Sequence, residues 1–202
     1  MYLGREKFKI TKIVAREILD CRFNPTVQVD VWVGDSVFGR ADVPAGRSRG
    51  EREAWEIRDG DSTIYGGLGV QGAVKNIHST IAPALLGMDV RDQRNIDLAM
   101  IKLDGTPNKK KLGGNAIIGV SLACARAAAN ACDLPLYRYL NVNAHVLPVP
   151  LLNYINGGRL TSNDLDFQEI CIFPVGAETF RESMLIGWDV YNILRDILIE
   201  KY

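Results

Sequence analysis

Histidine and cysteine, which build most zinc sites and nucleophilic triads, are scarce in this chain. The two histidines, His78 and His145, leave little material for a His-rich zinc site or a Ser/His/Asp triad. Four scattered cysteines without a Cys-x-x-Cys pair predict free, buried thiols at Cys21, Cys124, Cys132 and Cys171. We therefore expect any catalysis to depend on carboxylates, lysines and a hard metal ion.

The charges of the 202-residue chain cancel, with 24 Lys plus Arg against 24 Asp plus Glu. A neutral chain lacks the attraction to phosphate backbones that drives non-specific binding, so we expect no nucleic-acid partner. The longest apolar runs, such as residues 81–86 and 147–152, are too short to cross a bilayer, and residues 1–12 hold no apolar signal core. These features predict a cytoplasmic protein with no membrane span.

The N-terminal part alternates apolar and polar residues in the manner of a half-buried antiparallel sheet. A first apolar segment over residues 10–19 is followed by valines at every second position from Val27 to Val33. Turn residues at 34–36 then lead into a third strand over residues 37–43. We predict a three-stranded meander and, after it, a surface loop rich in Gly and Arg.

Beyond this loop the apolar period becomes helical. The spacing predicts helices near residues 70–85, 96–103 and 114–131, and Pro135 predicts a short helix that runs through Leu140. A meander followed by helices is typical of an α+β domain, which we expect to span residues 1–145.

A second unit, residues 146–202, shows two strand-like segments and one long helix. Residues 148–155 and 169–173 have the pattern of buried strands, and Thr179 with Glu182 has the spacing of a capping box. An apolar stripe runs along the helix after this box, through Phe180, Met184, Trp188, Tyr191, Leu194 and Leu198. Two strands and one helix cannot cover both faces of a sheet, so this unit is predicted to be the opening of a larger fold.

Several segments together resemble the enolase family. Residues 20–26 read Asp-Cys-Arg-Phe-Asn-Pro-Thr against the family's Asp-Ser-Arg-Gly-Asn-Pro-Thr, and residues 43–50 read Val-Pro-Ala-Gly-Arg-Ser-Arg-Gly against its Val-Pro-Ser-Gly-Ala-Ser-Thr-Gly loop. Five further segments follow in the family's order: residues 56–61, 112–117, 147–150, 156–158 and 174–177. The resemblance covers nearly the whole chain.

The resemblance implies an N-terminal α+β domain followed by the beginning of an enolase-type α/β barrel, incomplete in this chain. It implies dehydration of 2-phosphoglycerate to phosphoenolpyruvate in glycolysis, with Mg2+ stabilising the enediolate that forms when a lysine removes a proton. It also implies a homodimer, or a second chain that completes the barrel. Barrel carboxylates, the base lysine and the main acid glutamate of the family have no counterpart in these residues, so we expect the 202-residue chain alone to be inactive.

Five residues acquire roles by this resemblance. Ser48 matches the loop serine that binds Mg2+, Gln168 and Glu169 match a substrate-binding pair of which Glu169 is catalytic, and Arg16 and Asp189 match charged positions near the subunit interface. The residues alone favour a solvated loop serine at Ser48 and a surface or paired carboxylate at Glu169.

The chain departs from the family at polar positions. Leu160 stands where the family has a substrate histidine and Ala45 where it has the first loop serine, while Phe23 replaces a glycine. Leucine has no hydrogen-bonding group, so the histidine contact is lost. These changes support an alternative, a non-catalytic enolase-like binding or assembly protein. A third interpretation is a related metal-assisted lyase for another phosphorylated acid, suggested by Arg47, Arg49 and Arg159.

Overall fold

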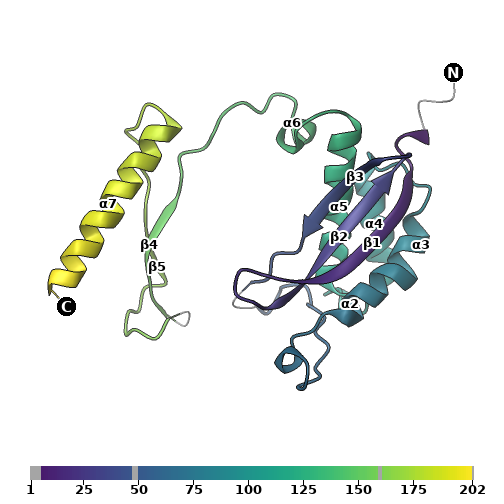
Figure 1. Ribbon diagram of the computed structural model, residues 1–202, viewed down its shortest axis with the longest axis horizontal. Coiled ribbons are helices and arrows are strands. Elements are labelled where there is room, and N and C mark those ends of the chain that lie inside the picture. The colour runs from purple at the N-terminus through teal and green to yellow at the C-terminus, as the bar shows by residue number, and fades with distance from the viewer. Residues whose placement is uncertain (1–5, 47–49, 159–160, 202) are drawn as a thin grey trace. The chain divides into compact units, whose positions relative to one another are not determined.

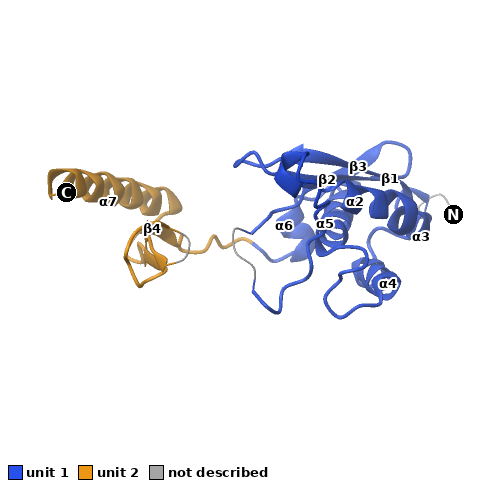
Figure 2. Cartoon of the chain, turned by 90° about the horizontal axis from the view of Figure 1, so that it is seen from below, with its two compact units in different colours: residues 1–144 blue, residues 145–202 orange. Residues whose placement is uncertain are grey.

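The computed structural model describes residues 6–46, 50–158 and 161–201. The chain divides into two compact units, residues 1–144 and 145–202 (Figure 2). Of the helices in these described ranges, none is both long enough and apolar enough to cross a membrane.

The first unit contains the predicted antiparallel meander. Its strands are β1 (Ile10–Leu19), β2 (Pro25–Val33) and β3 (Val37–Asp42), paired in the order β1-β2-β3 (Figure 1). Alternate valines of β2, from Val27 to Val33, are fully buried on the face that meets the helices. The period-two pattern and the antiparallel pairing that it predicted are therefore confirmed.

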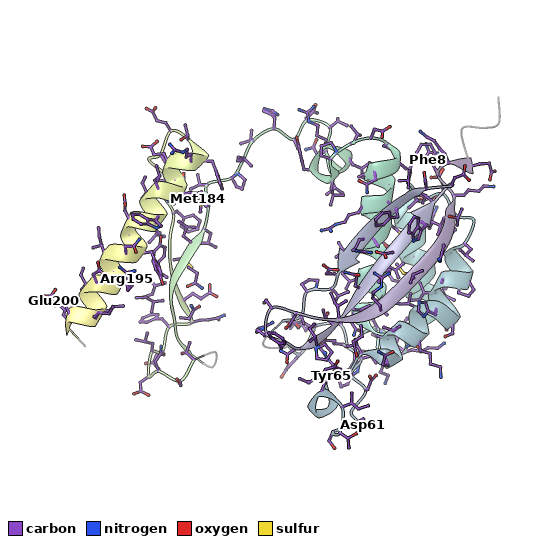
Figure 3. The ribbon with its side chains drawn as sticks, in the orientation of Figure 1. Phe8, Asp61, Tyr65, Met184, Arg195 and Glu200 are labelled. Carbon is purple, nitrogen blue, oxygen red and sulfur yellow. The ribbon has the colours of Figure 1, made fainter. Side chains whose placement is uncertain are left out.

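Helices cover one face of this sheet, as Figures 1 and 2 show. The helical elements of the first unit are, in chain order, the single turn η1 (Tyr65–Gly67), α2 (Gln71–Asn76), the π-helical turn η2 (Ile77–Ile81), α3 (Ala82–Leu85), α4 (Gln93–Asp104), α5 (Gly114–Ala131) and α6 (Leu136–Leu140). Asp61 and Tyr65 lie on the projecting loop before α2 (Figure 3). The α+β class predicted for this part of the chain is confirmed.

Helix α5 packs directly on β2 and β3 because small residues line the contact. A Cβ added to Gly39 of β3 would collide with the backbone of Ala127, and one added to Gly119 would lie 2.9 Å from methyl groups of Val29 and Val43. Any larger residue at either position would push the helix away from the sheet.

The outer face of the sheet carries a buried carboxylate between two arginines. The Asp30 side chain is 3% exposed and accepts hydrogen bonds from Arg16 Nη2 at 2.6 Å and from Arg40 Nε at 2.6 Å. The bond from Arg40, and then that from Arg16, hold the pKa of Asp30 below its ordinary value. Arg16 is thus engaged inside its own sheet, and its role at a subunit interface stays a prediction.

The turn between β1 and β2 places a phenylalanine in a backbone conformation that suits glycine. Phe23 has φ 60° and its side chain is 81% exposed. Asp20 fixes the turn, because its Oδ1 accepts the backbone N–H groups of Arg22 and Asn24 at 2.7 and 2.9 Å. The turn therefore imposes a left-handed backbone on a residue with a Cβ.

The second unit holds β4 (Leu152–Asn156), the antiparallel β5 (Glu169–Ile172) and α7 (Phe180–Lys201). Thr179 caps the helix as predicted, because its Oγ1 accepts the Glu182 N–H at 3.1 Å, but Glu182 Oε2 accepts the N–H of Glu178, one residue before the cap, at 2.8 Å rather than that of Thr179. The barrel domain is thus represented by its first elements only, as predicted.

The prediction for the first strand of the second unit was wrong in two details. The first strand begins at Leu152, not at residue 148, and it is half-buried rather than buried. Most of the apolar stripe of α7 is exposed, including Met184 (Figure 3), whereas Ser183 and Gly187 are the buried residues of the helix. The reason is that β4 meets the helix at Gly187, whose carbonyl accepts the Tyr154 hydroxyl, and two strands cover only this narrow face.

The thiols are free, but their burial differs from the prediction. Cys124 is buried within α5, and desolvation raises the pKa of its thiol to about 12. Cys21 is exposed in the β1–β2 turn, and Cys132 and Cys171 are half-buried. A turn residue cannot reach the core, which is why the prediction was wrong for Cys21.

Replacing Asp30 with Asn should lower the free energy of unfolding by about 2 kcal/mol at neutral pH, because two charge-assisted hydrogen bonds lose their anion. Since the folded-state pKa is lowered, this stabilisation is present above about pH 4 and disappears as the pH falls through the folded value. Urea denaturation of D30N and wild type, once at neutral pH and once below about pH 4, measures the change in the free energy of unfolding. The exposed Asp42, which accepts a hydrogen bond from Gln28 Nε2 at 2.7 Å, is the matched control; an equal loss in D42N would contradict the assignment.

Phe23→Gly should be more stable than Phe23→Ala by about 1 kcal/mol, because only glycine adopts φ 60° without a Cβ penalty. Both variants remove the ring, so their difference isolates the backbone cost. Urea denaturation of the pair provides the measurement, and equal midpoints would show that the turn relaxes.

Candidate functional site

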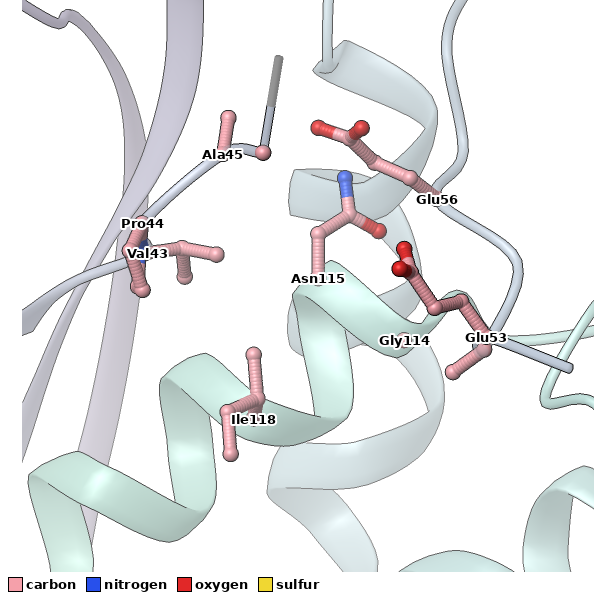
Figure 4. Close-up of a pocket in the computed structure, with 10 residues that line it drawn as sticks. Val43, Pro44, Ala45, Glu53, Glu56, Gly114, Asn115 and Ile118 are labelled. Atoms are coloured by element: carbon pink, nitrogen blue, oxygen red, sulfur yellow. The ribbon is translucent and has the colours of Figure 1, made fainter. Parts of the chain in front are cut away.

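A pocket lies where the loop after β3 faces the first turn of α5 (Figure 4). Its volume is about 330 Å³. Val43, Pro44, Ala45 and Gly46 form one wall, and the opposite wall and floor contain Glu53, Ala54, Glu56, Gly114, Asn115 and Ile118. Ser48, the predicted metal ligand, belongs to this loop but lies outside the described residues, as do Arg47 and Arg49.

A second, more polar pocket of about 520 Å³ shares Ala45, Gly46 and Glu56 with the first. Its remaining lining comes from the β1–β2 turn and the segment before α2: Asp20, Arg22, Asn24, Arg58 and Leu68. The Ala45–Gly46 segment is therefore a partition between two pockets, and its position decides the shape of both.

Arg58 braces the far side of these pockets. Its Nη1 donates to the carbonyls of Pro25 and Leu68, both at 2.6 Å, and its Nη2 pairs with the Glu56 carboxylate. One side chain thus ties the start of β2 to the segments on either side of the projecting loop. The side chain is only 16% exposed, so these contacts are shielded from water.

The same segment is tied to the helices at two further points. Asn115, at the start of α5, accepts the Ile57 N–H at 3.2 Å and donates to the Ile57 carbonyl at 3.0 Å. Asp59 accepts the N–H groups of Gln71 and Gly72 at the start of α2, both at 2.8 Å. These bonds hold Glu56 in place between two helix starts.

Gln168 and Glu169 lie in the second unit, next to each other at the start of β5. Because β5 runs antiparallel to β4, Glu169 pairs with Asn156, the last residue of β4. The carboxylate therefore lies at the carboxyl end of β4, which is the end where α/β barrels place their catalytic groups. It is exposed, and Cys171 Sγ donates to Glu169 Oε2 at 3.8 Å. Burial, and then this carboxylate, raise the pKa of the Cys171 thiol.

The face of the strands that bears Glu169 is turned away from the helix. Leu152 and Tyr154 contact α7 at Gly187. Side chains alternate along a strand, so Asn153 and its cross-strand partner Cys171 lie on the opposite face. Glu169, two residues from Cys171, shares that face, which in a closed barrel is the interior.

The two residues predicted to lie near a subunit interface belong to different units. Arg16 is bound to Asp30 in the first unit, and Asp189 is an exposed residue of α7 in the second. Leu160 and Arg159 lie outside the described residues. The polar groups that sequence reasoning did not assign are Arg22, Glu56, Arg58 and Asn115. The sequence offered little indication of their roles, because they occur in irregular segments or at a helix start, where no periodic pattern singles out a residue.

The described residues do not by themselves make a magnesium site. Among residues 6–46, 50–158 and 161–201, no group of three or more His, Cys, Asp or Glu side chains is placed to hold a metal ion. Glu53 and Glu56 line the first pocket, but the Glu56 carboxylate is paired with Arg58. A complete set of oxygen ligands would need groups beyond those described.

Comparison with known families gives two adjoining matches. The model described as "Enolase, N-terminal domain" matches residues 10–140, and that described as "Enolase, C-terminal TIM barrel domain" matches residues 144–202. The first match alone spans more than half of the chain, and the boundary between the two falls where the second compact unit begins.

Arg58→Ala should lower the free energy of unfolding by about 2 kcal/mol, since two carbonyls and the Glu56 carboxylate lose a shielded donor. Arg138→Ala is the control: that arginine is exposed on α6 of the same unit, and its loss should change stability by less than about 0.5 kcal/mol. Urea denaturation measures both. If the two variants have the same free energy of unfolding, the hydrogen bonds of Arg58 do not stabilise the first unit.

Proposed function

The chain belongs to the enolase family, and from this premise we propose that it supplies part of the catalytic site for dehydration of 2-phosphoglycerate to phosphoenolpyruvate. It carries the N-terminal domain and the start of the barrel of that family. The observation that carries the proposal is the place of Glu169 at the carboxyl end of β4, on the face turned away from α7. We keep the predicted domain limits, residues 1–145 and 146–202.

Glu169 and Gln168 are proposed to contact the substrate. An exposed carboxylate at a barrel mouth can hold or move a proton as the hydroxyl of 2-phosphoglycerate leaves. The neighbouring Gln168 offers an amide that can orient a carboxylate or phosphate oxygen without adding charge. The Gln168 backbone carbonyl accepts the Gly157 N–H at 2.9 Å, which fixes the pair relative to the end of β4.

Ser48 is proposed as a metal ligand on the loop whose base forms the partition between the two pockets. Enolases are generally Mg2+-dependent, and a hard cation there would neutralise charge that develops on the substrate carboxylate. The serine hydroxyl suits such a cation, but the other ligands have to come from the rest of a barrel. We accordingly propose that the 202-residue chain alone does not catalyse the reaction.

Completion of the barrel is proposed to come from further polypeptide, either continuous with this chain or a separate subunit. Arg16 and Asp189 are proposed to lie near an interface in a homodimer, and the assembly is expected in the cytoplasm. Native mass spectrometry of the protein from its source, which reports the chain mass and any bound polypeptide, identifies the assembly to be assayed.

A non-catalytic enolase-like binding or assembly role is the second candidate. It is favoured by Ala45, which places a methyl group at the partition where the family has a hydroxyl. Under this alternative the complete assembly forms but does not convert 2-phosphoglycerate at any Mg2+ concentration.

Glu169→Gln in the complete assembly should lower kcat about 100-fold, because the amide cannot exchange a proton. Phosphoenolpyruvate formation, followed by its ultraviolet absorbance with and without Mg2+, measures the rate. Glu178→Gln is the matched control, since Glu178 is an exposed glutamate beside α7 whose backbone N–H makes its contact with Glu182. An unchanged kcat in E169Q would exclude Glu169, and an inactive wild-type assembly would favour the non-catalytic alternative.

A further inference from the structure

The β1–β2 turn holds Arg22 in a fixed position. Asp20 accepts the backbone N–H of Arg22 at 2.7 Å and that of Asn24 at 2.9 Å, and the Asp20 N–H donates to the Asn24 carbonyl at 2.9 Å. The bond from Asn24, and then that from Arg22, hold the pKa of Asp20 below its ordinary value. These three hydrogen bonds hold the turn closed, and the Asp20 carboxylate is charged at neutral pH.

From this turn the arginine reaches across to the loop after β3. Arg22 Nη2 donates to the Ala45 carbonyl at 2.8 Å, while Arg22 Nε lies 3.9 Å from Asp20 Oδ2. Thr26 Oγ1 holds the Val43 carbonyl at 2.7 Å, at the end of the sheet. Beyond Val43, Arg22 is the side chain that hydrogen-bonds to residues 44–46 within the described ranges.

We propose that Arg22 is a positioning residue for the active-site loop: by holding the Ala45 carbonyl, it sets the partition between the two pockets. This inference rests on the proposed function for its catalytic consequence, but not for the contact itself. Ala45 and Gly46 line both pockets, so a shift of this segment changes the shape of both.

The contact acts on the loop rather than on global stability. The Arg22 side chain is 44% exposed, and hydrogen bonds and ion pairs of exposed groups contribute little to folding. A segment with few other contacts nevertheless changes its populated positions when one bond is lost. Arg58 differs in this respect, because it is shielded and ties three backbone segments together.

The sequence allows this contact to be observed at a single site. Ala45–Gly46 is the one Ala-Gly pair in the chain. Labelling with carbonyl-¹³C alanine and ¹⁵N glycine therefore yields one correlation between the Ala45 carbonyl and the Gly46 nitrogen in the full 202-residue chain. The ¹³C shift of a carbonyl responds directly to loss of a donor.

Arg22→Ala should move the Ala45 carbonyl resonance upfield, and Arg22→Lys should leave it closer to the wild-type position because an ammonium group still donates. Arg126→Ala is the matched control. Its guanidinium also donates to a backbone carbonyl, that of Arg40 at 2.9 Å, but away from the loop. If R22A moves the Ala45 resonance no more than R126A does, the proposal is overturned.

Activity provides the second readout. In the complete assembly, R22A should lower kcat about tenfold with a smaller change in KM. The loop can still contact the bound substrate, but it is displaced from the position that the reaction requires. R126A should leave both constants unchanged, and equal kcat in R22A and wild type would overturn the catalytic part. If the wild-type assembly is inactive, the proposed function fails while the Ala45 resonance still decides whether Arg22 positions the loop.

Discussion

The close approach of α5 to the sheet is the constraint on which the first unit depends. It requires a hydrogen side chain at Gly39 and Gly119, because any Cβ there would meet backbone or buried methyl groups. The approach fixes the position of α5 against the sheet. The first turn of the helix therefore places Asn115 beside the Ile57 backbone and opposite the loop after β3. The pockets exist because a sheet end and a helix start are held at this short separation.

The second unit obeys a different constraint, set by the antiparallel pairing of β4 and β5. A parallel pair would have placed the start of the second strand at the opposite end from Asn156. The antiparallel pair brings Glu169 to the carboxyl end of β4 instead. The exposed apolar residues of α7 follow from the same architecture, because a barrel helix is covered only when neighbouring strands and helices are present.

Sequence reasoning predicted features that repeat along the chain and missed those that depend on a single contact. The valines of β2, the limits of α5 and the Thr179 cap all carry a periodic or spaced signal. The π-helical turn at Ile77–Ile81 carries none, although it brings His78 Nε2 to accept the Ala15 N–H at 2.9 Å. The burial of Asp30 between two arginines was equally hidden, because cross-strand partners are set by register rather than by local sequence.

For the site, the sequence indicated which segments matter but not how charge is distributed among them. In the described part of the first unit, Glu56 is paired with Arg58, and Asp20 with Arg22. The walls of the second pocket, which contain both pairs, are therefore close to neutral, which suits a rigid frame more than a charge-bearing centre. A phosphate and a metal ion need uncompensated charge. In the proposed reaction, that charge comes from the loop beyond Gly46 and from barrel carboxylates and lysines, while the described part of the first unit fixes the shape of the two pockets.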